Sequence, residues 1–316
     1  MTRVDSPDFG PETDALLKHL ADQPSPDPDP YQALLLDREE LPDPALAGVR
    51  DPRPSVEDLV IDLPGRSLEA RVYRMSDRPR PILLWLHGGG FVGGHFRDIE
   101  YATSGIAANG NVTVVSLNYR LAPENPCPAG LQDAYETLGW IRENLDCGGR
   151  LAIGGQSAGA ALAAGACLLA REAGTPLPDR QVLCYPVLDL HPNADWHEWY
   201  FGTSPIPPGA VPLHADSLKG LPPTLMLAAE RDWLRDDALA YAARLKRDGV
   251  PTQLVEYADT MHAFLNFPAA LSAGRHAVEL IAADLRTAFS ARRSSAAGSA
   301  APPARAEHRA PARHRR

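Results

Sequence analysis

Apolar residues follow two alternating patterns along the middle of the chain. Short runs with almost continuous Val, Ile and Leu are typical of strands buried on both faces, and longer segments with apolar residues every three to four positions are typical of helices. The expected strands cover residues 81–86, 112–117, 150–154, 181–185, 223–229 and 252–257. The expected helices cover residues 99–108, 129–145, 158–171, 237–247 and 271–289.

A two-stranded unit precedes this alternation. Residues 57–62 and 68–73 alternate apolar and polar side chains around the turn signal Pro64-Gly65, so we expect a β-hairpin. Buried strands that alternate with helices indicate a mostly parallel central sheet with helices on both faces. The sequence therefore predicts an α/β domain over residues 55–290.

The two ends of the chain fall outside this pattern. Residues 1–54 are acidic and proline-rich, and short helices are expected over residues 13–20 and 31–40. This segment is too small for a core of its own, so we expect an N-terminal cap over the main domain. Residues 291–316 are rich in Ala, Pro, Arg and Ser, which predicts a disordered basic tail.

Residues 188–221 interrupt the alternation of strands and helices. The segment contains five prolines and a cluster of aromatic residues at positions 196, 199, 200 and 201. One interpretation is a covering loop with no further role. We favour a lid that lines a substrate pocket, because long insertions with aromatic side chains often have that function. Together with residues 1–54 it would form a small cap.

The segment Gly155-Gln156-Ser157-Ala158-Gly159 joins an expected strand to an expected helix. The pattern G-x-S-x-G in that position is typical of a nucleophile elbow, a tight turn that presents a serine at the end of a sheet. Small neighbours are needed because the strand and the helix pack closely around the turn. The pattern alone is equally compatible with a serine that caps the helix.

The segment His87-Gly88-Gly89-Gly90-Phe91 follows the strand at 81–86. Consecutive glycines allow backbone N–H groups to converge on one point, as an oxyanion hole requires. We expect the donors to be the amides of Gly88, Gly89 and Ala158. A phosphate-binding loop is the rival interpretation, but the Lys-Ser/Thr that should follow such a loop is missing.

Acid and base candidates follow the last two strands. His262 lies just beyond the strand at 252–257, where a general base is expected, and Asp232 lies just beyond the strand at 223–229. Asp236 and Asp237 compete with Asp232 but lie about one helical turn further on. The order Ser157, Asp232, His262 is the order that an α/β-hydrolase fold requires, so the sequence predicts that fold and this triad.

Charge and cysteine spacing narrow the function classes. The formal net charge of the 316 residues is −9. Residues 291–316 hold seven Arg and one Glu, so the rest of the chain carries −15, which argues against nucleic acid as a partner. The four cysteines lack the spacing of a zinc site or a disulfide framework, and no metal or other cofactor is expected. The chain has no secretory leader pattern and no run of 18 apolar residues, so we expect a cytoplasmic protein without a membrane span.

Several motifs together resemble the hormone-sensitive-lipase-like carboxylesterases, also called the GDXG lipolytic enzymes. Besides the glycine loop and the elbow, these motifs are Tyr119-Arg-Leu-Ala-Pro-Glu124, Tyr185-Pro-Val-Leu-Asp189 and Asp232-Trp-Leu-Arg-Asp236. The resemblance covers about residues 55–288. It implies an α/β-hydrolase that uses Ser157, Asp232 and His262 to cleave short-chain acyl esters without a cofactor.

Three positions depart from the family pattern. Gln156 replaces the usual acidic residue before the serine, Trp233 replaces a proline, and Ala263 replaces a glycine. None of these changes removes a triad member. We expect the substrate pocket to be lined by Phe91, Gln156, Trp196, Trp199 and Trp233.

The sequence leaves other functions open. The main prediction is a serine hydrolase that acts on a small-molecule ester through an acyl-enzyme intermediate. The same residues could cleave an amide, so an N-deacylase or acetyl-hydrolase of a specialised metabolite is the alternative. A non-catalytic receptor on a hydrolase scaffold is disfavoured because all three triad residues are present. The oligomeric state is not determined by the sequence, and a homodimer is one option.

Overall fold

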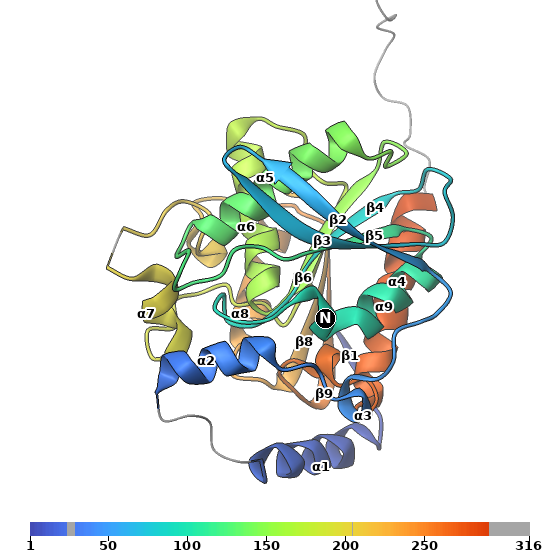
Figure 1. The fold of residues 1–316 in the computed structure, drawn as a ribbon, viewed down its shortest axis with the longest axis vertical. Helices are drawn as coiled ribbons and strands as arrows, with labels where there is room; N and C mark the ends of the chain where they lie inside the picture. The colour runs from blue at the N-terminus through green and yellow to red at the C-terminus, as the bar shows by residue number, and fades with distance from the viewer. Residues whose placement is uncertain (24–28, 204, 291–316) are drawn as a thin grey trace, which may run out of the picture.

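The computed structural model describes residues 1–23, 29–203 and 205–290. Its centre is a nine-stranded sheet of order β1-β9-β8-β7-β6-β4-β5-β3-β2 (Figure 1). The strands are β1 (Thr2–Val4), β2 (Ser55–Leu63), β3 (Arg66–Arg74), β4 (Ile82–Leu86), β5 (Thr113–Leu117), β6 (Leu151–Gln156), β7 (Arg180–Cys184), β8 (Thr224–Arg231) and β9 (Thr252–Met261). Strand β3 pairs antiparallel with β2 and with β5, and the other strand pairs among the described residues are parallel. This arrangement confirms the predicted hairpin and mostly parallel sheet.

Helices cover both faces of the sheet. They are α1 (Phe9–Ala21), α2 (Pro30–Glu39), α3 (Pro44–Ala47), α4 (Glu100–Gly110), α5 (Ala129–Asn144), α6 (Ala158–Ala173), α7 (Asp195–Phe201), α8 (Arg235–Arg247) and α9 (Ser272–Ser290). Alternate side chains of β4 point to opposite faces: Leu84 packs into the core under α5, α6 and α8, and Trp85 into the core under α4 and α9. Both layers are buried, which explains the uninterrupted apolar runs of the strands.

The N-terminal segment is joined to the sheet as well as lying over it. Its first residues form β1, which pairs parallel with β9, from Thr2 opposite Val255 to Val4 opposite Tyr257. Helix α1 then buries Phe9 and Leu16 in the core that also contains α9. The division of the chain at residue 54 stays a prediction, and the predicted tail at 291–316 lies outside the described residues.

The segment 188–221 contains two short elements that its sequence pattern did not indicate. These are α7 and the 3-10 helix η2 (Pro212–His214). Helix α7 is too short for apolar periodicity to be recognised, but its last two residues, Tyr200 and Phe201, are buried. Figure 1 shows α7 at one end of α2, so both parts of the expected cap lie on the same side of the molecule.

Candidate active site

Ser157 occupies a strained turn between β6 and α6. Its backbone has φ +52° and ψ −120°, a conformation that non-glycine residues rarely adopt. The two flanking glycines are required by close contacts: a Cβ on Gly155 would lie 2.6 Å from the carbonyl oxygen of Leu86, and one on Gly159 would overlap the carbonyl oxygens of Leu86 and His87. The turn is therefore pressed against the end of β4, and the hydroxyl is held above the sheet.

His262 joins the serine to a carboxylate. Its Nε2 lies 3.0 Å from Oγ of Ser157, and its Nδ1 lies 2.7 Å from Oδ2 of Asp232. The other carboxylate oxygen of Asp232 accepts a hydrogen bond of 2.8 Å from the N–H of Leu234, and this side chain is only 1% exposed. The imidazole is one-quarter exposed. The geometry therefore fits a serine–histidine–carboxylate triad whose imidazole is partly open to solvent.

The competing carboxylates lie elsewhere. Asp236 is exposed and faces Arg235 at the start of α8. Asp237 is buried, where one carboxylate oxygen accepts hydrogen bonds from the backbone N–H groups of Leu188 and Asp189 and contacts Nε2 of His191 at 2.9 Å. Asp237 therefore fixes the start of the segment 188–221.

The glycine loop after β4 lies beside the serine turn. Gly89 has φ +118°, and a Cβ there would overlap the carbonyl oxygen of Gly93, so glycine is required for the loop to fold back on itself. Within the described residues, the backbone amides of Gly88 and Gly89 donate to no protein acceptor. These two amides are therefore available to donate to an oxyanion, and the amide of Ala158, at the N-terminus of α6, stays the predicted third donor.

His87 supports the loop from below. Its ring is buried and stacked on Tyr119, with 4.3 Å between centroids, and the Tyr119 hydroxyl donates to the His87 carbonyl oxygen over 3.0 Å. Burial lowers the pKa of His87 to about 4, so the ring is neutral at neutral pH. This arrangement gives His87 a structural role.

A family comparison decides the identity of the fold. The model of a family described as having the alpha/beta hydrolase fold matches residues 83–266, which is more than half of the chain. The chain belongs to this family. It is 32% identical to Esterase LipI of Mycobacterium tuberculosis over 72% of this chain and 80% of LipI. The structure of a Pyrobaculum calidifontis esterase superposes with a TM-score of 0.75 and 32% identity, over 90% of this chain and all of that one. The predicted resemblance to hormone-sensitive-lipase-like carboxylesterases and the predicted α/β-hydrolase fold are thereby confirmed.

The expected pocket residues of this hydrolase lie in different places. Phe91 is buried against Tyr200, with ring centroids 3.9 Å apart, and Trp196 packs edge-on to it at 5.1 Å. Trp233 is 58% exposed, and its ring centroid lies 6.4 Å from that of His262. The remaining two are Gln156, buried beneath the serine turn, and Trp199, which packs edge-on to Tyr31 of α2.

Sequence reasoning missed a side chain that connects α2 to the site. Nε of Arg38 donates to the carbonyl oxygen of Val92 over 2.7 Å, and one Nη donates to that of Ala122 over 2.6 Å. The guanidinium also forms a two-pronged ion pair with Glu124, at 3.0 and 3.1 Å. No local pattern marks Arg38, because all of its partners lie more than 50 residues away.

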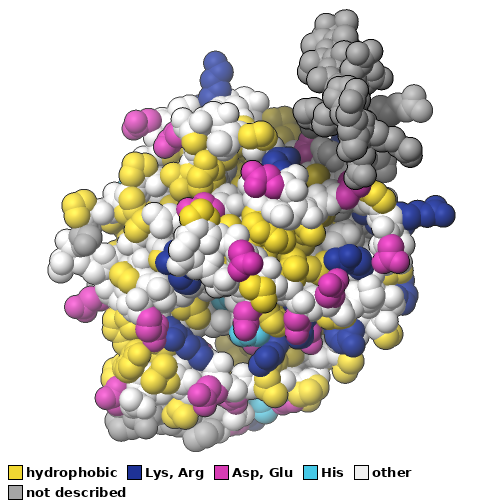
Figure 2. Space-filling view, turned by 45° about the horizontal axis from the view of Figure 1, so that its top comes forward, with side chains coloured by type: hydrophobic (Ala, Val, Ile, Leu, Met, Phe, Trp, Pro, Cys, Tyr) yellow, Lys and Arg dark blue, Asp and Glu magenta, His cyan; other side chains and the backbone are white. Residues whose placement is uncertain are grey.

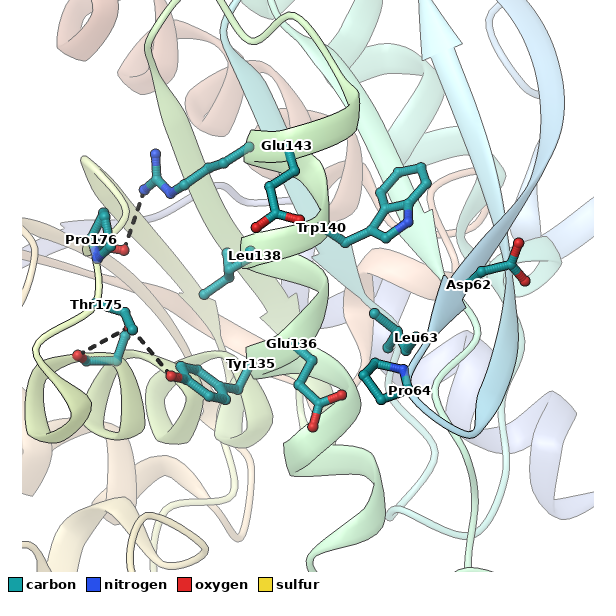
Figure 3. A pocket seen from close by; sticks show the side chains of 13 residues that line it. Asp62, Leu63, Pro64, Tyr135, Glu136, Leu138, Trp140, Glu143, Thr175 and Pro176 are labelled. Carbon is teal, nitrogen blue, oxygen red and sulfur yellow. Dashed lines mark hydrogen bonds between the residues drawn. The ribbon is translucent and has the colours of Figure 1, made fainter.

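Two surface cavities lie away from the triad. One of about 330 Å³ lies between α5, the β2–β3 turn and the end of α6, and the other, of about 360 Å³, lies between residues 41–50 and α4. In the first, Trp140 extends from α5 toward the β2–β3 hairpin, and Tyr135 extends toward Thr175 (Figure 3). Neither cavity includes a triad residue, so we assign no part of the hydrolytic site to them.

Figure 2 shows acidic and basic side chains interspersed over one face, rather than gathered by sign. Among the described residues, no three His, Cys, Asp or Glu side chains are placed to hold a metal ion. None of the described helices has the length and apolar character needed to span a membrane.

Proposed function

We propose that this hydrolase cleaves carboxylic esters with short acyl chains, with Ser157 as nucleophile, His262 as general base and Asp232 as the carboxylate that orients it. The observation that carries the proposal is the imidazole of His262, hydrogen-bonded to both partners at 3.0 and 2.7 Å. Relatives such as LipI bear the name esterase, which supports the same reaction class.

The geometry supports a two-step reaction. Nε2 of His262 accepts the proton of Ser157 as Oγ attacks the acyl carbon, while Asp232 stabilises the imidazolium. The amides of Gly88, Gly89 and Ala158 hold the oxyanion, and His262 returns the proton to the departing alcohol. Water then repeats the sequence on the acyl-enzyme and releases the acid.

The aromatic cluster beside the glycine loop supports the preference for short acyl chains. Trp196 packs so closely over the loop that a Cβ on Gly90 would lie 2.8 Å from its ring. Phe91 fills the space behind, because it is stacked on the buried Tyr200. These side chains fill space beside the glycine loop, which supports a short acyl chain.

A chain-length series tests the proposal. With p-nitrophenyl esters from acetate to palmitate, we expect kcat/KM to be highest at four carbons or fewer. Ser157→Ala should lose on the order of 10⁴-fold or more in rate and all labelling by a fluorophosphonate, whereas Ser67→Ala, at a serine outside the site, should change neither. Near-normal hydrolysis by Ser157→Ala would refute the assignment, and a maximum at long chains would refute the preference.

Amide cleavage is the second candidate. A relative from Streptomyces hygroscopicus, 33% identical over 65% of this chain and 75% of its own length, is named Acetyl-hydrolase, a name that specifies neither an ester nor an amide bond. The same series run with the matching anilides separates the two, because turnover of anilides above that of esters would favour the deacylase. The cytoplasmic location and the oligomeric state, homodimer included, stay predictions from the sequence.

A further inference from the structure

Gln156, the residue before the nucleophile, is a buried amide with both ends bonded. Its side chain is almost inaccessible, with the residue 2% exposed. Oε1 accepts a hydrogen bond of 3.0 Å from the hydroxyl of Tyr185, and Nε2 donates one of 2.6 Å to Oδ1 of Asn266. A buried glutamine held at both ends is fixed in one orientation.

Both partners belong to the surroundings of the base. Tyr185 directly follows β7, and its ring packs edge-on to that of His262, with centroids 5.0 Å apart. Asn266 ends the 3-10 helix η3 (Phe264–Asn266), which begins two residues after His262. The Gln156 side chain therefore connects the serine turn to the loop that carries the imidazole by two separate routes.

The same side chain also lies beside the glycine loop. Gly88 lies next to it, because a Cβ placed on Gly88 would be 3.4 Å from both Cγ and Nε2 of Gln156. Gln156 therefore lies close to the nucleophile, to the residues around the base and to one expected oxyanion donor. Loss of its shape or its bonds should disturb their relative positions.

The bridge carries no charge. The titratable groups on the surrounding strand ends are His87, Cys184, Tyr185, Asp232 and His262. Burial raises the pKa of Tyr185 well above its ordinary value and also raises that of Cys184, while it lowers the pKa of His87 to about 4. These three groups are neutral at neutral pH, which leaves the pair Asp232–His262 as the polar centre that a new charge would act on.

We propose that Gln156 is a positioning residue, which aligns His262 with Ser157 through an uncharged bridge to Tyr185 and Asn266. This inference rests on the proposed function, because it concerns the rate of the same acyl transfer. Misalignment of a base by a fraction of an ångström lowers the rate of the chemical step rather than the binding of substrate.

A matched pair of buried glutamines tests the alignment. Gln181 lies at the other end of β7 from the site, fully buried, with Nε2 bonded to Thr224 over 3.0 Å. We expect Gln156→Leu to lower kcat by about 10- to 100-fold with KM within about 3-fold, and Gln181→Leu to lower Tm without changing kcat. Equal kcat for both variants and wild type would overturn the proposal.

Asn266→Leu removes the bridge from its far end and keeps the test valid if Gln156→Leu fails to fold. We expect a smaller loss of kcat in Asn266→Leu and, in the double variant, a loss well below the product of the two single losses. Full additivity would mean that the two residues act independently and would overturn the bridge.

A charge introduced at this position gives a second readout. Gln156→Glu places a negative charge where it stabilises the imidazolium form of His262. The acid limb of the pH profile of kcat/KM should therefore move by about 0.5 to 1.5 pH units to higher pH. A loss of rate with the limb unmoved would contradict this placement. Fluorophosphonate labelling separates the two hypotheses: unlabelled Ser157 in the wild type refutes the proposed function, whereas wild-type labelling and hydrolysis rates in Gln156→Leu refute only the positioning role.

Discussion

Arg38 offers a direct test of how the N-terminal segment is held at the active site. Arg38→Met retains most of the aliphatic stem and removes every hydrogen bond of the guanidinium. The lost bonds are those to the carbonyl oxygens of Val92 and Ala122, at 2.7 and 2.6 Å, and the ion pair with Glu124. Helix α2 should then detach from the loops more easily, without unfolding of the sheet.

The magnitude follows from the exposure of each bond. The ion pair is worth about 0.5–1 kcal/mol, because Glu124 is 40% exposed and solvent screens it. Each bond from the charged guanidinium to a carbonyl oxygen adds about 1–1.5 kcal/mol, since Arg38 is 18% exposed. The total, about 2.5–4 kcal/mol, corresponds to roughly 70- to 1,000-fold more frequent opening of α2.

Hydrogen exchange measured by mass spectrometry resolves this change. In Arg38→Met the amides of α2 should exchange faster by that factor, while those of β6 and β8 keep their protection. Glu124→Gln is the matched control, because it removes only the charge of the ion pair and should speed exchange by less than about 5-fold. Wild-type protection of α2 in Arg38→Met would refute the reasoning.

Three further predictions concern single side chains. Asp232→Asn should lower kcat on the order of 10³- to 10⁴-fold in steady-state ester hydrolysis, because Leu234 holds the retained oxygen and the new NH₂ faces Nδ1 of His262; activity within 10-fold of wild type would contradict this. Asp98 lies in a 3-10 helix (Phe96–Ile99), where burial raises the pKa of its carboxyl group to about 6. Its ionisation therefore destabilises the fold as the pH rises from about 4 to 6. Across that window Asp98→Asn should gain on the order of 1–2 kcal/mol of unfolding free energy over wild type in urea; a pH-independent difference is the opposing result. Ala263 has φ +60°, a conformation that glycine adopts with less strain, so Ala263→Gly should raise Tm by about 1–2 °C in calorimetry. Ala288→Gly, in α9, should lower Tm; the same sign of change in both variants would exclude backbone strain at Ala263.

The sheet could be predicted from the sequence because its strands are buried on both faces. The expected strands at 81–86 and 112–117 differ from β4 and β5 by one residue at their N-terminal ends. The expected strand at 252–257 is too short, since β9 continues to Met261, which pairs with Arg231 beyond an irregularity in the ladder. Asp259, with φ +49°, marks that irregularity, and its polar surroundings resemble a loop in sequence.

Features that depend on distant partners could not be predicted. Strand β1 has three residues, and it forms because β9 offers an unpaired edge and because Arg3 contacts Glu230 and Glu256. In the site, the triad candidates were found from their places after strands. Asn266 has no such signal, because its side chain is bonded to that of Gln156, which lies 110 residues away in the sequence.

The order of strands in the sheet explains which residues meet. Ser157 follows β6 and Asp232 follows β8, with β7 between them, so the two lie about two strand spacings, roughly 10 Å, apart. The imidazole of His262 with its hydrogen bonds of 3.0 and 2.7 Å spans such a gap, whereas neighbouring strands would leave no room for the ring. The residue that follows the intervening strand is therefore placed to fill the space beside the imidazole. Tyr185 occupies this place, since its buried neutral ring packs against His262 and its hydroxyl is bonded to Gln156.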